Sequence, residues 1–260
     1  MSVSIKLIST DFDGTLFSEF ENPPIPRSLL ELLAELQAEG AKWVINTGRE
    51  MSSLIETLAR AGITLEPDYL VLVEREIHMH QESQYVGLEE WNTACTKVHA
   101  DLFALLEPFL PSVIERINKC FHASIFEDAY SPLCLVARDN DQMDGIHSYL
   151  DEFCRSIPDL TVVRNDVYAR FSHRSYNKGS ALGEIARRLG ISSQEVLAVG
   201  DHLNDLPMLS PKYAAFLAAP ANAVTAVKLA VQSAHGYVSL RQHGNGVADA
   251  IKYYLEQGGA

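Results

Sequence analysis

Short apolar stretches alternate with amphipathic stretches over the first quarter of this chain, and the alternation limits the folds that it can adopt. Strand-length apolar runs occur at 5–8, 43–46 and 69–73, and apolar residues recur at helical spacing at about 28–36 and 51–61. Strands that alternate with helices form right-handed βαβ units and a parallel sheet. The sequence therefore predicts an α/β fold with a Rossmann-like parallel sheet.

The alternation changes character after the third strand and resumes with a helix at 178–189 and a strand at 195–199. The segment between has its own helices and strands, including a hairpin at about 78–86, so we interpret it as a separate α/β module inserted into the first. The predicted domains are a core made of residues 1–80 and 175–260 and an inserted α/β domain at 81–174.

Composition narrows the classes of function. The chain has 260 residues, of which 47% are hydrophobic and 21% charged, as in ordinary globular proteins, and its formal net charge is −13. This charge repels nucleic acid and anionic membranes, so any site for an anion needs its own cations. The four cysteines form no C-x-x-C pair, and no apolar run has membrane-spanning length. We expect a cytoplasmic protein without a zinc knuckle or a disulfide framework.

Two carboxylates, Asp11 and Asp13, directly follow the first predicted strand. Side chains of extended backbone repeat with a period of two, so both leave the strand on the same side, and Gly14 then allows a sharp turn. Neighbouring carboxylates repel each other unless a cation lies between them or one keeps a proton. The alternative for a bare Asp-x-Asp-Gly is a turn with helix-capping aspartates.

Three further polar clusters follow predicted strands or open a predicted helix. They are Thr47-Gly48-Arg49, Lys178-Gly179-Ser180 and Gly200-Asp201-His202-Leu203-Asn204-Asp205. Alone, these clusters are typical of a turn, a solvated helix start and an N-cap. Open parallel sheets, however, bind ligands beyond the carboxyl ends of their strands, and the free N–H groups at a helix start favour an anion. Together with Asp11 and Asp13, these three clusters supply a nucleophile, a proton carrier, a metal site and phosphate-binding groups at one sheet edge.

The order and spacing of these four signatures resemble those of the haloacid dehalogenase superfamily of phosphohydrolases, in the branch that includes Cof-like sugar phosphatases and sucrose-phosphate phosphatase. The insertion between the second and third signatures resembles the mobile cap of that branch. The resemblance implies that Asp11 is the nucleophile that forms an aspartyl-phosphate and that Asp13 carries the proton. The first and fourth signatures are specific for this family. The second and third are informative only when the first and fourth are also present.

The resemblance also implies a magnesium site and a phosphate site. Mg²⁺ would be held by Asp11, the backbone carbonyl of Asp13 and Asp201, and Asn204 and Asp205 would orient these ligands. The groups expected to bind the phosphoryl oxygens are Thr47, Gly48, Arg49, Lys178 and Asn204, of which Thr47 and Lys178 would also stabilise the transition state. Arg49 could equally pair with a neighbouring carboxylate.

The chain departs from the family pattern after the third strand. Many relatives have Asn-Gly-Ala there, whereas this chain has Glu74-Arg75-Glu76, so substrates should not be transferred from those relatives. The segment before Lys178 is rich in polar and cationic groups. We hypothesise that His173 or Arg174 contacts the non-reacting part of the substrate; a solvated hinge is the alternative.

The sequence favours a magnesium-dependent phosphomonoester hydrolase that acts on a small phosphorylated metabolite, with a sugar phosphate as the preferred class. A phosphomutase-like phosphotransferase is the nearest alternative in chemistry. A non-catalytic module that senses a phosphorylated ligand is an alternative from another class, but sensing needs no proton carrier such as Asp13. We expect no nucleic-acid or membrane partner and a monomer or weak homodimer.

Overall fold

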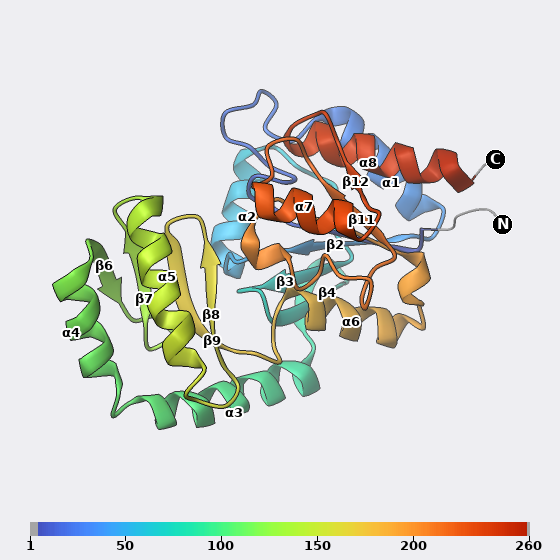
Figure 1. The fold of residues 1–260 in the computed structure, drawn as a ribbon. Helices are drawn as coiled ribbons and strands as arrows, with labels where there is room; N and C mark the ends of the chain where they lie inside the picture. The colour runs from blue at the N-terminus through green and yellow to red at the C-terminus, as the bar shows by residue number, and fades with distance from the viewer. Residues whose placement is uncertain (1–4, 259–260) are drawn as a thin grey trace. The chain divides into compact units, whose positions relative to one another are not determined.

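The computed structural model describes residues 5–258, which form two compact units. One unit contains the chain up to Glu89 and again from Asn177, and the other is Glu90–Tyr176. The sequence placed these two boundaries at 80/81 and 174/175. The first unit has a central, mainly parallel sheet with helices on its faces, as Figure 1 shows, and this confirms the predicted α/β fold class.

The core sheet has eight strands in the order β12-β11-β10-β1-β2-β3-β4-β5. Neighbouring strands from β12 to β3 are parallel, and β4 and β5 continue the sheet as antiparallel strands. The strands are β1 (Leu7–Thr10), β2 (Lys42–Asn46), β3 (Tyr69–Leu72), β4 (Glu76–Gln81), β5 (Gln84–Gly87), β10 (Val196–Val199), β11 (Phe216–Ala219) and β12 (Tyr237–Val238).

The hairpin predicted at 78–86 is present, but it belongs to the core sheet rather than to the inserted domain. Its first strand, β4, pairs with β3 so that Ile77 lies opposite Val71 and His78 opposite Leu70. Ile77 is fully buried in this position. The hairpin therefore extends the core sheet on the β3 side.

Strand β1 begins and ends two residues later than its apolar run predicted. Its last residues, Ser9 and Thr10, are polar yet fully buried. Thr10 Oγ1 accepts a hydrogen bond from Trp43 Nε1 at 3.2 Å, which satisfies one of these polar groups inside the sheet. The shift places Asp11 directly at the carboxyl end of the strand.

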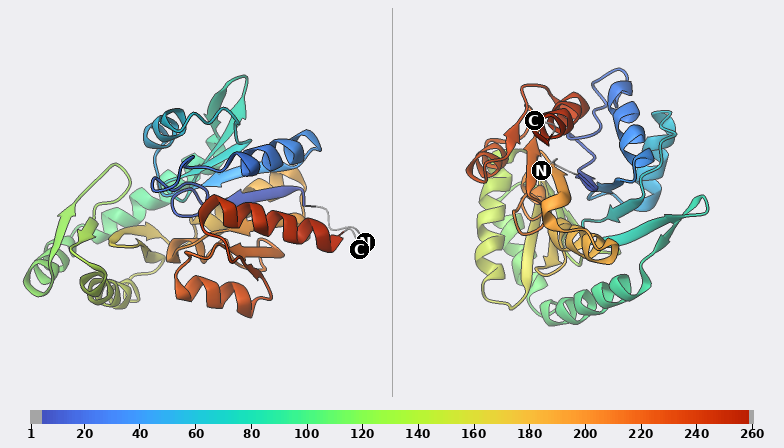
Figure 2. Two further views of the ribbon diagram at one scale, coloured as in Figure 1. Left: turned by 90° about the horizontal axis from the view of Figure 1, so that it is seen from above. Right: turned by 90° about the vertical axis from the view of Figure 1, so that its right-hand side faces the viewer.

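Helices cover both faces of the core sheet. Figures 1 and 2 show α1 and α8 side by side on one face and α6 on the other, and α7 packs against β11 and β12. The helices are α1 (Arg27–Ala38), α2 (Met51–Arg60), α6 (Lys178–Leu189), α7 (Thr225–Ser233) and α8 (His243–Gly258), with short 3₁₀ turns at Ser193–Glu195 and Leu203–Asp205. Helix α8 begins four residues before the predicted start at Val247. Two glycines in its first turn have low helix propensity and hide this start in the sequence.

The unit Glu90–Tyr176 has an antiparallel sheet of its own in the order β6-β7-β9-β8, with helices packed against it. Apolar side chains from the sheet and the helices, among them Leu106, Ile146 and Phe171, form its separate buried core. Its elements are α3 (Glu89–Leu106), α4 (Leu110–Cys120), β6 (Ala123–Phe126), β7 (Cys134–Ala137), α5 (Asn140–Cys154), β8 (Leu160–Asn165) and β9 (Tyr168–His173). All four cysteines of the chain are free, and three are buried.

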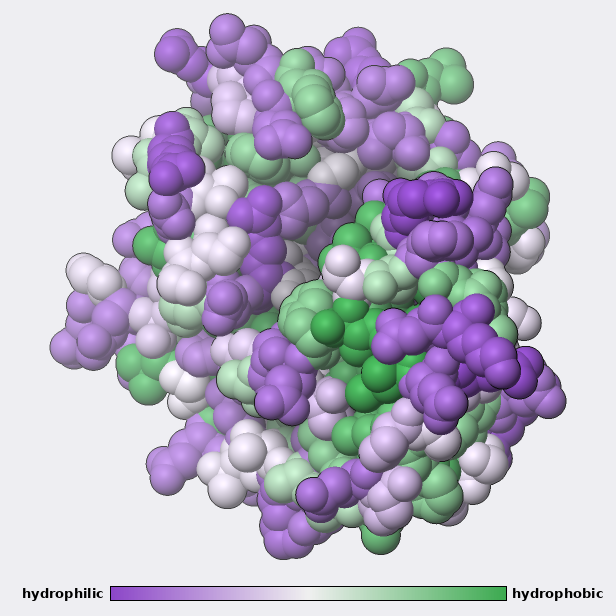
Figure 3. Space-filling view, turned by 90° about the vertical axis from the view of Figure 1, so that its left-hand side faces the viewer, coloured by the Kyte–Doolittle hydropathy of each residue, from purple (hydrophilic) through white to green (hydrophobic). Residues whose placement is uncertain are grey.

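Hydrophilic residues predominate on the face shown in Figure 3, where hydrophobic residues gather mainly in a smaller area. Among the helices within residues 5–258, none is both long and apolar enough to cross a membrane.

Candidate functional site

Three parallel strands bring the first, second and fourth signatures to one edge of the core sheet. Thr10, the last residue of β1, is in register with Ile45 of β2 and Val199 of β10. The chain segments that follow, which start near Asp11, Thr47 and Asp201, therefore leave the sheet at the same level. The Asp11 N–H donates to the Val199 carbonyl at 2.9 Å and so continues the β1 to β10 pairing by one more bond.

A buried lysine joins two carboxylates at this edge. Lys178 Nζ donates to Asp11 Oδ1 and to Asp205 Oδ1, both at 2.6 Å. The side chains of Lys178 and Asp205 are fully buried, and that of Asp11 is 6% exposed. Buried ions need partners with good hydrogen-bond geometry, and removing one partner leaves an uncompensated charge. The three residues therefore depend on one another for their charge states.

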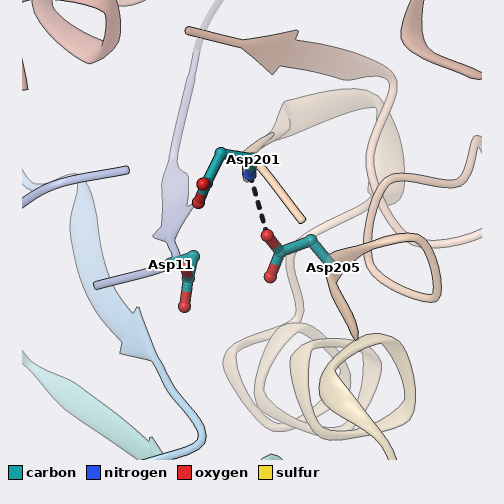
Figure 4. Close-up of side chains that lie close together, drawn as sticks. All are labelled: Asp11, Asp201 and Asp205. Atoms are coloured by element: carbon teal, nitrogen blue, oxygen red, sulfur yellow. Dashed lines mark hydrogen bonds between the residues drawn. The ribbon is translucent and has the colours of Figure 1, made fainter. Parts of the chain in front are cut away.

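Asp205 uses both of its carboxylate oxygens within the protein. While Oδ1 accepts from Lys178, Oδ2 accepts from the N–H groups of Asp201 and His202 at 2.8 and 2.9 Å. Figure 4 shows the bond to Asp201 and the three carboxylates of Asp11, Asp201 and Asp205 gathered in one place. Asp205 thus fixes the loop that presents Asp201.

The turn after Asp13 packs directly against Asp201. Thr15 Oγ1 donates to Asp201 Oδ1 at 2.6 Å. Gly14 has a φ of +79°, and a Cβ atom there would lie 2.5 Å from Asp201 Oδ2. Both the left-handed backbone and the close approach require glycine at this position. The first and fourth signatures therefore pack directly against each other.

Crowding shifts the proton affinities of the aspartates. Burial raises the pKa of Asp11 well above its usual value, and the neighbouring Asp205 and Asp201 raise it further, against the opposing effect of Lys178. Burial and Asp205 raise the pKa of Asp201 to about 6. Burial by itself would lower the pKa of Lys178, but the carboxylates around it, Asp11 first, raise that pKa. The site carries more negative charge than its lysine neutralises.

The donors at this site fit magnesium. Carboxylate oxygens of Asp11, Asp201 and Asp205 lie within 4.8 Å of one another. Asn204 adds a buried amide oxygen, Oδ1, which has no hydrogen-bond partner among residues 5–258. Mg²⁺ prefers oxygen ligands and keeps several waters, which would donate to such an acceptor. Because Asp205 already has three hydrogen bonds, Asp11 and Asp201 are the carboxylates better placed to ligate the ion.

Arg49 pairs with Asp13 through two parallel hydrogen bonds. Arg49 Nε and Nη2 donate to the two carboxylate oxygens of Asp13, each at 2.7 Å. Arg49 Nη1 donates to Thr57 Oγ1 at 2.5 Å, and the guanidinium lies 5.3 Å from the centre of the Phe12 ring. Of the two roles that the sequence left open for Arg49, the structure therefore contains the carboxylate pair.

The second signature is tied to its surroundings by short contacts. Thr47 is buried, and its Oγ1 accepts from the Arg49 N–H at 3.1 Å. A Cβ atom on Gly48 would lie 3.5 Å from Glu74 Oε1, in ordinary contact. Asn204 Nδ2 donates to the same Glu74 oxygen at 2.8 Å. Glu74 therefore lies between the second and fourth signatures.

One expectation about the third signature is wrong for two of its N–H groups. The sequence suggested that free N–H groups at the start of the helix would favour an anion. In the structure Asn177 caps α6, and its Oδ1 accepts from the N–H groups of Gly179 and Ser180, each at 3.0 Å. These donors are satisfied inside the protein because asparagine is a strong N-cap residue. Two N–H groups at this helix start are therefore not free for an anion, and Lys178 is the group of the third signature that contacts Asp11.

The two candidates for substrate specificity make contacts within the second unit. The His173 N–H donates to His99 Nε2 at 3.1 Å, and the His173 ring belongs to a ring cluster with His99 and Tyr176. Arg174 Nη2 donates to the Leu160 carbonyl at 3.2 Å. The contact of either residue with a substrate stays a prediction.

Two residues outside the signatures contact the loop that follows Asp11 and were not identified from the sequence. Asn222 Nδ2 and His243 Nδ1 lie 2.7 and 2.9 Å from the carbonyl oxygen of Gly14, and the His243 N–H donates to Asn222 Oδ1. A carbonyl only accepts, so Nδ1 of His243 carries the hydrogen. Asn222 follows β11, and its place just after a parallel strand was the available signal.

Comparisons with known proteins agree with this geometry. The sequence profile of the haloacid dehalogenase-like hydrolases matches residues 8–73 and 115–251. The 5-amino-6-(5-phospho-D-ribitylamino)uracil phosphatase YcsE of Bacillus subtilis is 25% identical over 97% of each chain. A phosphoglycolate phosphatase of Methanothrix thermoacetophila is 29% identical over 55% of this chain and 61% of its own. The sucrose-phosphatase of Synechocystis sp. PCC6803, solved with sucrose and phosphate, has a TM-score of 0.72 at 17% identity, covering 96% of this chain and 98% of its own.

Proposed function

Because this chain belongs to the haloacid dehalogenase-like hydrolases, we propose that it is a magnesium-dependent phosphatase that hydrolyses a small phosphate monoester through an aspartyl-phosphate. YcsE, which is similar to this chain over 97% of each sequence, is named as a phosphatase. The observation that carries the proposal is the buried contact of Lys178 with Asp11 at the end of the central strand, beside Asp201. This arrangement offers a nucleophile, a cation for phosphoryl oxygens and a metal ligand in one place.

Asp11 acts as the nucleophile in this proposal. Lys178 holds Asp11 Oδ1, so the other oxygen attacks phosphorus. The new bond joins that oxygen to phosphorus while the ester P–O bond breaks, and the departing oxygen takes a proton from Asp13. A water then attacks the aspartyl-phosphate, Asp13 accepts its proton, and the Asp11–phosphorus bond breaks to release inorganic phosphate.

Asp13 must leave its present partner to carry this proton. Arg49 occupies both of its carboxylate oxygens, so protonation of Asp13 requires at least one of the two hydrogen bonds to break. We expect the arginine to be freed at the same moment to contact a phosphoryl oxygen. The pair and the phosphate contact are then two successive states of Arg49.

Mg²⁺, when bound, would neutralise charge on the phosphoryl group, held by Asp11, Asp201 and the backbone carbonyl of Asp13. Asp205 keeps Asp201 in position through its N–H group. Thr47 accepts from the Arg49 N–H and can donate its own hydrogen to a phosphoryl oxygen, next to the backbone of Gly48.

The substrate is proposed to be a sugar phosphate. Support comes from two proteins that this chain resembles. YcsE is named for a phosphate ester on a ribityl chain, and the sucrose-phosphatase was solved with sucrose and phosphate. Sucrose and the ribityl group are both rich in hydroxyl groups.

Phosphate release tests this function. The purified full chain is incubated with Mg²⁺ and a panel of phosphorylated sugars and other small phosphate esters, and inorganic phosphate is measured. We expect release from at least one sugar phosphate, its loss in EDTA and its loss in Asp11→Asn. Asp101→Asn, at an exposed ion pair on α3, is the matched control and should keep full activity. No release from any substrate, or undiminished release by Asp11→Asn, would contradict the proposal.

A further inference from the structure

Glu74 occupies the turn between β3 and β4 with an unusual backbone conformation. Val73 and Glu74 have φ values of +44° and +66°, in the left-handed region that residues with a side chain rarely adopt. Such conformations persist where the surrounding structure fixes them, and they cluster at functional sites. Glu74 is also buried, with 6% of its surface exposed. A carboxylate held in this way is a candidate for a specific task.

The turn is joined to the second signature through its backbone. The Val73 N–H donates to the Arg49 carbonyl at 3.0 Å, and the Glu74 N–H donates to the Thr47 carbonyl at 2.9 Å. The two left-handed residues thereby place the Glu74 side chain beside Gly48. Its position is fixed relative to the nucleophile because Thr47 and Asp11 follow adjacent strands of one sheet.

The Glu74 carboxylate determines how the Asn204 amide is oriented. Asn204 Nδ2 donates to Glu74 Oε1 at 2.8 Å. An ionised carboxylate only accepts hydrogen bonds, so the amide must turn its NH₂ group toward Glu74 and its oxygen away. That oxygen, Asn204 Oδ1, is buried and has no hydrogen-bond partner among residues 5–258. A buried acceptor without a donor from the protein is available to a water or another bound group.

We propose that Glu74 is a positioning residue that orients Asn204 so that its Oδ1 accepts a hydrogen bond from a water bound to Mg²⁺. The inference rests on the proposed function and adds to it a residue that lies outside the four signatures. A glutamine at position 74 could accept or donate, so it would leave both amide orientations available. A glycine would leave Asn204 without its acceptor.

Mg²⁺ binding to the substrate-free full chain tests the proposal by calorimetry. Partners of metal-site residues typically contribute 10- to 100-fold to affinity, so we expect Glu74→Gly to raise the Kd for Mg²⁺ by about 10-fold. Glu74→Gln should fall between the wild type and Glu74→Gly. Glu76→Gln removes a charge at the first residue of β4, two positions further along the chain, and should change the Kd by less than about twofold. Circular dichroism should show a folded Glu74→Gly protein, because glycine readily adopts a φ of +66°.

A double-mutant cycle with Asn204→Ala distinguishes two ways in which Glu74 could act on Mg²⁺ binding: by orienting the Asn204 amide, or directly through its own negative charge. If Glu74 acts through Asn204, Glu74→Gly should have no further effect on the Kd in the Asn204→Ala background. An undiminished effect in that background, or a Kd within twofold of the wild type for Glu74→Gly alone, would overturn the inference. A wild type that binds no Mg²⁺ would overturn the magnesium-dependent function and this inference with it. If the wild type binds Mg²⁺ and releases phosphate, and the Glu74 variants bind Mg²⁺ as tightly as the wild type does, the role of Glu74 is overturned but the proposed function is not.

Discussion

Replacing Asp201 by asparagine should stabilise the metal-free protein while removing its response to magnesium. Burial and the neighbouring Asp205 raise the pKa of Asp201 to about 6 from an ordinary value of 3.8. One pKa unit corresponds to about 1.4 kcal/mol, so ionising Asp201 costs the folded state about 3 kcal/mol at neutral pH. Asparagine keeps an oxygen for the hydrogen bond from Thr15 and carries no charge.

The sign of the pH dependence follows from the direction of this shift. The folded state binds the Asp201 proton more tightly than the unfolded state, so its contribution to stability is lost as pH rises from about 4 through about 6. In EDTA at about pH 8, Asp201→Asn should unfold with a free energy about 2–3 kcal/mol higher than the wild type, and the melting temperature should rise by about 4–12 °C. The difference should shrink as the pH is lowered toward 4.

Thermal and urea unfolding across this pH range, with EDTA and with excess Mg²⁺, measure both effects. Mg²⁺ should stabilise the wild type increasingly as pH rises, because protons and the ion compete for the same carboxylates. It should leave Asp201→Asn nearly unchanged. Asp101→Asn, on an exposed pair, controls for a surface charge change. Equal stability of Asp201→Asn and the wild type in EDTA at about pH 8, or a gain that is the same at every pH, would refute the reasoning.

Three further predictions concern Lys178, Asn222 and Arg174. Lys178→Met leaves two buried carboxylates without their cation, so the free energy of unfolding in urea at neutral pH should fall by about 3–5 kcal/mol; a loss below about 1 kcal/mol would contradict the burial argument. Asn222→Ala removes a donor to the Gly14 carbonyl and should lower kcat about tenfold or more with a smaller change in KM, since misplaced catalytic groups lose rate; an unchanged kcat would show that the loop needs no such support. Arg174→Ala should lower kcat/KM toward the best substrate if Arg174 contacts its non-reacting part, and an unchanged value removes that hypothesis.

The sequence predicts most of the core sheet because periodicity reports local structure well. Helix α6 has the predicted bounds, whereas the polar end of β1 and the glycine-rich start of α8 were missed. Tertiary contacts decide both: Thr10 is satisfied inside the sheet, and a Cβ atom on Gly244 would lie 2.5 Å from Pro26. The hairpin of β4 and β5 was placed in the inserted domain because a local pattern cannot tell which sheet a hairpin joins.

In the candidate site, the sequence predicts where the residues lie along the sheet but not which side chains pair with one another. Strand ends predict that Asp11, Thr47 and Asp201 share one edge, because parallel strands carry their ligands there. Spacing does not predict that Arg49 pairs with Asp13, or that Glu74 reaches Asn204 from 130 positions away. These contacts depend on rotamers and on how separate loops meet, which only the folded chain determines.

The central claim is that Asp11 becomes covalently phosphorylated while Asp13 only moves the proton. An activated ester such as p-nitrophenyl phosphate needs little help from a general acid, so the Asp13→Asn variant should still be phosphorylated. The aspartyl-phosphate should then be hydrolysed slowly, because no residue at position 13 accepts the proton of the attacking water. Acid quenching followed by peptide mass spectrometry should then find one added phosphoryl group on Asp11 in Asp13→Asn and none at position 11 in Asp11→Asn. A phosphoryl group on another residue, its absence from Asp13→Asn, or the same result for both variants would contradict the account.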